Sequence, residues 1–255
     1  MTENQKPLVN CVMVTGKTPE RVAFAKLARL SFREQTYARK RLVIITTAAS
    51  DDWADETSEN VVVVRVADPA TPLGTLRNLG LSKCLPGYVV QWDDDDWSHP
   101  ERIAWQQGWT AANEASLLRY QIRYSLLRDA AFVMRYDSRG IPGTLMHPLT
   151  ANQVELAYEA VGKHEDSRFR NKYFAGAEAL LNSDAIFPGP AMHIRFYHGF
   201  NTWDEQHVMR DLAGEDHRGE WRVPLDQAVY LKKVVLRYMA VGLTCVQFIS
   251  GNKLG

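Results

Sequence analysis

The chain has 255 residues, and its 30 Lys and Arg side chains balance 30 Asp and Glu side chains, so it carries no formal net charge. Hydrophobic residues make up 45% and charged residues 24%, a composition that is typical of globular proteins and excludes a disordered chain. A neutral total also removes the simplest argument for a polyanionic partner, although it leaves room for a local basic patch.

Cysteine usage and hydropathy give no sign of export or of membrane insertion. The three cysteines, Cys11, Cys84 and Cys245, are far apart and form no close pair, so neither a disulfide framework nor a zinc site is predicted. The N-terminus lacks an apolar signal core, and the longest apolar stretch, 234–249, is too short to span a bilayer comfortably. We therefore expect a cytoplasmic protein without a transmembrane segment.

The first hundred residues alternate between strand-like and helix-like patterns. Apolar, β-branched runs predict strands at Val9–Val14, Leu42–Thr46, Val61–Val66 and Gly87–Trp92, and the intervening segments predict helices over 19–37 and 74–84. Continuous apolar strands separated by helices are typical of a mostly parallel sheet that is covered on both faces. The predicted fold class is therefore α/β, with ligands bound at the carboxyl ends of the strands.

The second half has a less regular pattern. It predicts a helix over 101–119, a strand or a helix over 120–136, a helix over 151–161 and a strand over 193–197. The stretch 219–255 is expected to form a helical extension. Within it, LKKVVLRYMAVGLTCVQFI at 231–249 could be a helix that docks on the core or one that lies on a membrane surface. Since no repeat and no convincing linker divides the chain, we expect a single domain over residues 1–255.

Four consecutive acids, Asp93–Asp96, directly follow the fourth predicted strand. Their carboxylates would repel one another unless a cation or hydrogen-bond donors compensate them. One or two of them could cap the helix expected from residue 101, because carboxylates suit a helix N-terminus. The full run is better explained by Mg²⁺ or Mn²⁺, which prefer oxygen ligands. Polar loops at 15–18 and 46–52 end two other strands, so the sequence predicts a metal and phosphate site at this edge of the sheet.

The segment VVQWDDDDWSHPERI at 89–103 resembles the DxD-containing segment of GT-A-fold glycosyltransferases, in the large family 2 group of inverting enzymes. Further segments fit the same family in sequence order: the opening strand and helix at 9–35 with LVIIT at 42–46, GTLRNLGL at 74–81, IPGTLMH at 141–147, GKHEDSRF at 162–169 and FYHGFNTW at 196–203. The segment at 141–147 looks like the strand that precedes the family's acceptor site.

The resemblance implies a GT-A fold, in which a Rossmann-like, mostly parallel central sheet is flanked by helices and followed by an irregular acceptor-side half. It divides the single domain into a nucleotide-sugar-binding half at about 9–100, an acceptor half at about 101–218 and the extension at 219–255. The implied activity is that of a metal-dependent, inverting hexosyl- or pentosyltransferase. Such an enzyme moves a sugar from a nucleoside-diphosphate donor, with UDP-sugar favoured, to a hydroxyl acceptor.

The resemblance also assigns site residues. It implies donor binding by Thr15, Thr47, Asp51, Arg77, Asn78, Asp93 and Asp94; Mn²⁺ or Mg²⁺ binding by Asp95 and His198; and catalysis by Asp166 as the general base, with Glu165 beside it. Asp94 and Asp96 could instead support the metal ligand or cap the next helix. His198 could contact the diphosphate or be a plain turn histidine, and the pair Glu165–Asp166 could be a solvated helix start.

Three questions stay open at this stage. The acceptor could be a glycan, a lipid-linked sugar, a protein or, as in phage-type enzymes, a hydroxymethylated base in DNA. A sugar nucleotidyltransferase would also need carboxylates and a metal, although TGKTPER at 15–21 poorly matches its triphosphate loop. The chain could also be a nucleotide-sugar-binding relative without turnover. The sequence does not predict an oligomeric state.

Overall fold

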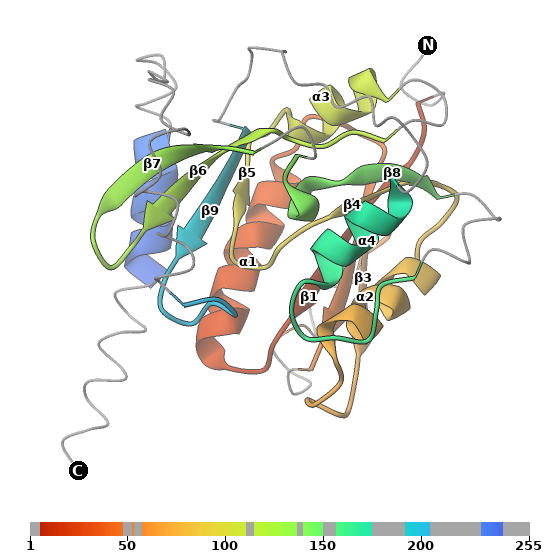
Figure 1. The fold of residues 1–255 in the computed structure, drawn as a ribbon, viewed down its shortest axis with the longest axis horizontal. Coiled ribbons are helices and arrows are strands. Elements are labelled where there is room, and N and C mark those ends of the chain that lie inside the picture. The colour runs from red at the N-terminus through yellow and green to blue at the C-terminus, as the bar shows by residue number, and fades with distance from the viewer. Residues whose placement is uncertain are drawn as a thin grey trace.

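The computed structural model describes residues 6–47, 53, 58–110, 115–136, 140–149, 157–174, 192–204 and 231–241 (Figure 1). The main sheet has the strand order β3-β2-β1-β4-β8, and its strands are β1 (Val9–Thr15), β2 (Lys40–Thr46), β3 (Val61–Arg65), β4 (Gly87–Gln91) and β8 (Met146–Leu149). The first four run parallel to one another, and β8 pairs antiparallel with β4. The expected mostly parallel α/β sheet is therefore confirmed.

Helices cover both faces of this sheet because its central strands are apolar on both sides. On one face, α1 (Pro19–Arg33) packs its small and apolar side chains against Val9, Cys11 and Met13 of β1. On the other face, α2 (Leu73–Ser82) packs against Val43 and Ile45 of β2. This alternation along each strand is the period of two that directs successive side chains to opposite faces.

A smaller sheet forms beside the first, with the order β5-β9-β6-β7. Its strands are β5 (Trp97–Ser98), β6 (Tyr120–Ser125), β7 (Ala130–Arg135) and β9 (His193–Tyr197). The strands β6 and β7 form a hairpin, which settles the choice between strand and helix for 120–136, and β9 lies parallel to β6 as predicted for 193–197. The two-residue strand β5 was not expected, and it joins the acidic segment to β9.

Residues 231–241 form a helix, coloured blue in Figure 1, which packs against the second sheet. Leu231, Val234 and Tyr238 are buried in one apolar cluster with Phe24 of α1 and Phe196 of β9. The expected docking of a C-terminal helix on the core is confirmed for these residues. Among the described helices, none combines the length and the apolarity that a membrane span would need.

Three predicted helices differ from the observed ones. The first ends at Arg33 rather than at 37, because the side chain of Gln35 turns to the loop at 98–100 and donates to the carbonyl of His99 at 2.7 Å. The second is α3 (Arg102–Trp109), and beyond it Ser116 pairs with Met146 in a β-bridge.

The third, expected at 151–161, is not helical over the described residues 157–161, and 151–156 lie outside the described residues. The segment at 141–147 begins with a short 3₁₀ helix, Pro142–Thr144, so its strand β8 starts only at Met146. The helix that follows in the chain is α4 (Glu165–Tyr173).

Candidate active site

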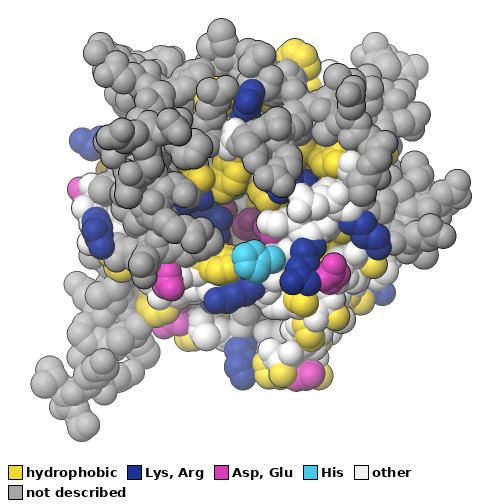
Figure 2. All heavy atoms as spheres, viewed as in Figure 1, with side chains coloured by type: hydrophobic (Ala, Val, Ile, Leu, Met, Phe, Trp, Pro, Cys, Tyr) yellow, Lys and Arg dark blue, Asp and Glu magenta, His cyan; other side chains and the backbone are white. Residues whose placement is uncertain are grey.

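A cavity of about 320 Å³ opens where β1 and β4 of the main sheet end. The acidic loop after β4, the first turn of α4, and β9 with the loop that follows it all contribute to its lining. Figure 2 shows acidic side chains recessed near the centre of this face, with Lys and Arg side chains around them. Six carboxylates but only four Lys or Arg side chains line the cavity, so it has an acidic excess although the whole chain is neutral.

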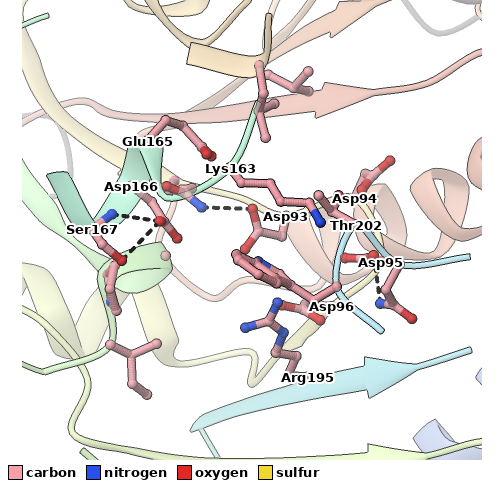
Figure 3. Close-up of a pocket in the computed structure, with 18 of the residues that line it drawn as sticks. Asp93, Asp94, Asp95, Asp96, Lys163, Glu165, Asp166, Ser167, Arg195 and Thr202 are labelled. Carbon is pink, nitrogen blue, oxygen red and sulfur yellow. Dashed lines mark hydrogen bonds between the residues drawn. The ribbon is translucent and has the colours of Figure 1, made fainter. Parts of the chain in front are cut away.

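The acidic loop is fixed at both ends by its neighbours in the fold. Before the acids, the buried indole of Trp92 donates to the carbonyl of Ala28 in α1 at 3.0 Å. After the acids, Trp97 and Ser98 form β5 and pair with β9. A rigid loop can hold four neighbouring carboxylates in different directions, and Figure 3 shows Asp93–Asp96 arranged along one side of the cavity.

Asp93 is bound by two side chains at the floor of the cavity. Its Oδ1 accepts from Gln91 Nε2 at 2.9 Å and from Arg77 Nη2 at 3.2 Å. A side chain at Gly143 would place its Cβ only 3.0 Å from Asp93 Oδ2. The glycine in IPGTLMH therefore leaves the second carboxylate oxygen of Asp93 accessible from that side.

Arg77 also binds Glu165, and so it joins the acidic loop to α4. Its Nε donates to Glu165 Oε1 at 3.0 Å, and both side chains are almost fully buried. Burial raises the pKa of Glu165, while the charge of Arg77 opposes that rise. The carboxylate of Glu165 is thus held in place by a buried guanidinium.

Asp95 lies at the centre of a second cluster. Its Oδ2 accepts from Arg21 Nη1 at 2.6 Å, from Asn201 Nδ2 at 3.2 Å and from His198 Nε2 at 3.2 Å. Burial opposes ionisation of Asp95, but the charge of Arg21 and the contact with His198 outweigh it, so the pKa lies below its ordinary value. This carboxylate is therefore ionised and partnered by a cation.

Asp94 is buried beside this cluster. Its Oδ1 lies 3.4 Å from Arg21 Nη1, and its Oδ2 has no hydrogen-bond partner in the described part of the chain. Burial raises the pKa of Asp94 to about 7, and the charge of Asp95 adds to this while Arg21 opposes it. Asp94 is therefore less well compensated than its neighbour Asp95.

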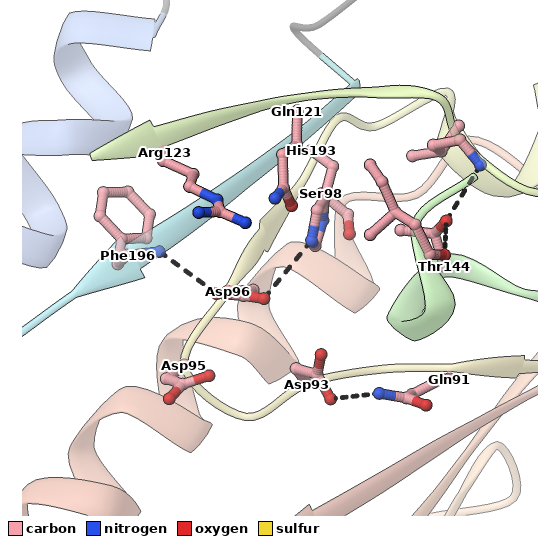
Figure 4. A network of polar contacts seen from close by, with 12 residues as sticks. Gln91, Asp93, Asp95, Asp96, Ser98, Gln121, Arg123, Thr144, His193 and Phe196 are labelled. Atoms are coloured by element: carbon pink, nitrogen blue, oxygen red, sulfur yellow. Dashed lines mark hydrogen bonds and ion pairs between the residues drawn. The ribbon is translucent and has the colours of Figure 1, made fainter. Parts of the chain in front are cut away.

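Asp96 points away from the others, toward the second sheet (Figure 4). Its Oδ1 accepts from the backbone N–H of Phe196 at 3.2 Å, and its Oδ2 lies 3.4 Å from His193 Nε2. It does not cap α3, whose N-cap is Glu101. Burial, together with the charges of Asp95 and Asp93, raises the pKa of Asp96, while burial lowers that of His193 to about 3.

Asp166 faces the acidic loop from the opposite side of the cavity (Figure 3). It lies in the first turn of α4, and its Oδ1 accepts from the backbone N–H of Ser167 at 2.6 Å and from Ser167 Oγ at 3.3 Å. These two hydrogen bonds orient the carboxylate through Oδ1, and neither of them involves Oδ2.

The turn before α4 closes one rim of the cavity. His164 adopts a left-handed backbone conformation with φ of 64°, which is uncommon for a residue other than glycine. The next residue back, Lys163, places its ammonium 4.6 Å from the ring centre of Trp203, and the His164 ring lies edge-on to the same indole. The loops before α4 and after β9 therefore meet through these three side chains.

The structure brings most of the predicted residues to the cavity, but not all of them. Arg77, Asp93–Asp96, Glu165 and Asp166 line it. His198 is not among the lining residues, but it contacts Asp95. Asn78 instead exchanges two hydrogen bonds with the backbone of Tyr158, at 2.9 and 2.8 Å, and it does not line the cavity.

The other predicted donor residues lie at or beyond the strand ends. Thr15 is buried at the end of β1, and Thr47 follows β2 with its backbone N–H bonded to the carbonyl of Thr15. Neither is among the residues that line the cavity. Asp51 lies outside the described residues.

Sequence reasoning missed Arg21, Asn201 and Arg195, which all line the cavity. The sequence did contain an indication that Arg21 lies near the site, because it is a cation in the first turn of a helix that follows directly after a strand. Asn201 is part of the HGFNTW segment but was not singled out. Arg195 alternates with Ile194 and Phe196 in β9, so the period of two places it on the same face as His193, but the sequence does not show that this face borders the cavity.

The arrangement fits a divalent cation in part. Within the described residues, no group of three or more His, Cys, Asp or Glu side chains is placed to hold a metal ion alone. A Mg²⁺ site of a nucleotide enzyme commonly uses only one or two carboxylates, together with phosphate oxygens and water. Asp95 and Asp94, with its unpartnered buried oxygen, meet that requirement.

His198 fits a metal less well in this geometry. Its Nδ1 accepts from the backbone N–H of Phe200 at 3.2 Å, which puts the proton of the neutral ring on Nε2, the atom that faces Asp95. A nitrogen that carries a proton cannot ligate a metal. The ring, stacked on Phe24 with centroids 4.1 Å apart, is positioned as a hydrogen-bond donor.

The strand order, the flanking helices and the acidic loop at the end of β4 define an α/β fold of the GT-A type. Solved structures of S. aureus TarS share this fold. A TarS 1–349 structure in complex with UDP matches with a TM-score of 0.57 and 11% identity, covering 94% of this chain and 91% of that chain.

A second TarS structure, in complex with UDP-GlcNAc, gives a TM-score of 0.58 and 12% identity, covering 91% of this chain and 73% of that chain. No protein-family model matches the chain, and no curated protein sequence matches it. At this level of identity, the similarity establishes the fold.

Proposed function

We propose that this chain is a nucleotide-sugar-dependent, inverting glycosyltransferase, with a UDP-sugar as the favoured donor and a hydroxyl group as the acceptor. The observation that carries the proposal is the convergence of Asp93–Asp95 and Asp166 on opposite sides of one cavity at the carboxyl ends of the parallel strands. The similarity in fold to TarS, which was solved with UDP and with UDP-GlcNAc, supports this class of donor.

The donor diphosphate would lie over the acidic loop. Mn²⁺ or Mg²⁺, held there by Asp95 and Asp94, would neutralise the charge of the nucleoside diphosphate as it leaves. His198 and Asn201 orient the Asp95 carboxylate through hydrogen bonds to Oδ2. Gln91 and Arg77 fix the Asp93 carboxylate, and we assign it the role of accepting from a ribose hydroxyl of the nucleotide.

Asp166 is the residue that we assign as general base. It takes the proton of the acceptor hydroxyl as that oxygen attacks the anomeric carbon and the bond from this carbon to the diphosphate oxygen breaks. Attack from the face opposite the leaving group inverts the anomeric configuration. Glu165 has its carboxylate engaged by Arg77, so we assign it a positioning role, in which it fixes the first turn of α4 relative to the acidic loop.

The donor assignment is tested by a thermal-shift screen of UDP, GDP, CDP and TDP, each with and without Mn²⁺. A ligand that binds only the folded state stabilises it by RT ln(1 + [L]/Kd), so the correct nucleotide gives the largest shift. We expect UDP with Mn²⁺ to stabilise the protein most. If none of the four nucleotides has any effect, the proposed donor class is wrong.

Turnover needs a separate measurement. Slow release of UDP from a UDP-sugar, with water as the acceptor, would show catalysis before the acceptor is known. UDP-sugar binding without any release, in the presence of glycan, protein and hydroxymethylated DNA acceptors, would instead support the non-catalytic alternative.

A further inference from the structure

Arg21 lies where the proposed metal site would be. It belongs to the first turn of α1, where Thr18 caps the helix by accepting from the Arg21 backbone N–H at 3.3 Å. From this fixed backbone, the guanidinium reaches Asp95 Oδ2 at 2.6 Å and Asp94 Oδ1 at 3.4 Å. One cationic group therefore bridges both carboxylates that fit a divalent ion.

The oxygen that Arg21 contacts has no further capacity. Asp95 Oδ2 already accepts from Arg21, His198 and Asn201, and a carboxylate oxygen offers about two lone-pair sites. A divalent cation that takes this oxygen must displace at least one donor. Of the three, Arg21 carries the fixed positive charge, so it is the one that the cation repels most strongly.

We propose that Arg21 is a built-in competitor of the divalent cation: it occupies the Asp94–Asp95 pair in the free protein and leaves Asp95 when the cation binds. This inference depends on the metal dependence proposed above. A nucleoside diphosphate would offer the displaced guanidinium a new anionic partner. The metal and the nucleotide should therefore bind more tightly together than either does alone.

The experiment measures binding of Mn²⁺ alone to the metal-free full-length chain by calorimetry, in parallel with Mn²⁺ binding in the presence of UDP. Removing the competitor in R21Q should tighten Mn²⁺ binding by about 5- to 150-fold, the usual range for coupling between two sites. K26Q is the matched control, because exposed Lys26 lies on the same helix and its loss changes the net charge equally. We expect K26Q to bind Mn²⁺ as the wild type does.

The outcomes separate the two proposals. If the wild type binds Mn²⁺ only weakly and R21Q binds it no more tightly, the competitor role is overturned while the metal site stands. If neither protein binds Mn²⁺ even with UDP, the metal dependence itself fails and the competitor role fails with it.

A second measurement avoids any folding defect in R21Q. Phenylglyoxal labels accessible guanidinium groups, and peptide mass spectrometry can follow Arg21 in the wild type. Adding Mn²⁺ should raise the labelling of Arg21, because the side chain leaves Asp95. Labelling that is unchanged at Mn²⁺ concentrations that saturate the site would contradict the proposal.

Discussion

Arg77 holds carboxylates on both sides of the cavity at once. Its Nη2 contacts Asp93 in the acidic loop, and its Nε contacts Glu165 at the start of α4. Arginine offers five donors in a fixed plane, so its Nε and Nη2 each serve a different acid from one rigid geometry, whereas a lysine would present a single nitrogen with rotatable donors. The donor side and the base side of the cavity are therefore linked through a single buried side chain.

The assignment of Asp166 as the base predicts a separation of binding from turnover. In D166N the amide cannot accept the acceptor's proton, while the residues around the proposed donor position are unchanged. We expect kcat to fall by roughly 10²–10⁴-fold, the usual contribution of a general base, with little change in donor affinity. E159Q, which removes an exposed acid from the turn before α4, is the control and should keep full activity. Near-normal turnover in D166N would mean that another group is the base.

Asp95 gives a prediction about the nucleotide. D95N removes the negative charge but keeps nearly the same shape, so the increase in UDP affinity that Mn²⁺ produces should be lost. Calorimetry of UDP with and without Mn²⁺ measures this increase. E59Q changes an exposed acid that is not among the residues lining the cavity, and it should bind UDP with and without Mn²⁺ as the wild type does. An unchanged response to Mn²⁺ in D95N would remove Asp95 from the metal site.

His193 gives a prediction about acid stability. Its pKa in the folded protein is about 3, whereas an unfolded histidine has a pKa of about 6.5, so between these values only the unfolded chain binds the proton. This term therefore lowers the free energy of unfolding as the pH falls from about 6.5 to 3. In H193Q the term is absent, and urea titrations at pH 7 and pH 5 should show a smaller loss than in the wild type. Equal losses in both proteins would argue against a buried neutral His193.

At the scale of elements, α2 depends on its glycines for close packing on the sheet. A Cβ at Gly80 would lie 2.4 Å from Val12 Cγ1 of β1, and one at Gly74 would lie 1.8 Å from the carbonyl oxygen of Glu159. The two glycines of GTLRNLGL thus let the helix approach β1 on one side and the turn before α4 on the other. Arg77, between them in the sequence, is carried to the floor of the cavity by this approach.

This packing predicts opposite effects for two glycine-to-alanine changes. G80A should lower the free energy of unfolding by about 1–3 kcal/mol, because the added methyl group overlaps a stiff side chain in a central strand. Gly108 in α3 has no atom within 4 Å of an added Cβ, so G108A should stabilise the protein by about 0.5–1 kcal/mol through its helix propensity. Urea denaturation measures both; a neutral G80A would show that α2 can shift away from β1.

The elements that sequence patterns predicted well are those that short-range properties determine. The four parallel strands are apolar runs, and their bounds agree with the predictions to within about two residues. The predicted helix over 101–119 failed beyond Trp109 because residues there bond to distant partners, such as Ser116 to Met146 and Leu118 to the Thr144 hydroxyl. Such pairings are set by the tertiary fold, which local periodicity does not reveal.

The same distinction applies to the site. The cluster of acids could be predicted from the sequence, because its four carboxylates are adjacent. Their hydrogen-bond partners could not be predicted, since Arg21 lies 74 positions before Asp95 and Asn201 lies 106 positions after it. The family resemblance brought Asp166 and Arg77 to notice, but only the fold shows that Arg77 binds Glu165 and that Asn78 binds the backbone of Tyr158.

At the scale of the whole molecule, the C-terminal helix at 231–241 supports the site from outside. Tyr238 donates from its hydroxyl to the backbone carbonyl of Asp96 at 2.9 Å, and its ring stacks on Phe196 with centroids 4.1 Å apart. The helix therefore contacts the acidic loop, the second sheet and α1 together. Although this helix is distant from the acidic loop in sequence, its removal would affect the cavity through the lost contact between Tyr238 and Asp96.

The contacts of Tyr238 predict that its hydroxyl group and its ring contribute separately to the free energy of unfolding. Y238F keeps the stacking but leaves the buried carbonyl of Asp96 without this donor, so we expect the free energy of unfolding to fall by about 1 kcal/mol. L236A, which truncates an exposed side chain on the same helix, should change it by less than about 0.5 kcal/mol. Chemical denaturation of both variants provides the comparison, and equal effects would show that the hydroxyl contributes nothing specific.

The partners of the acidic loop also differ in when the ribosome makes them. Arg21 and Arg77 precede the acids in the chain, so a nascent chain that has reached Asp95 already contains the cations for Asp93, Asp94 and Asp95. Phe196, which donates to Asp96, follows it by 100 residues, a delay of roughly 5–20 s at ordinary elongation rates. Asp93, Asp94 and Asp95 can thus pair with cations while the chain is still being synthesised. Asp96 can gain its partners only after the second sheet and the helix that contains Tyr238 have been translated.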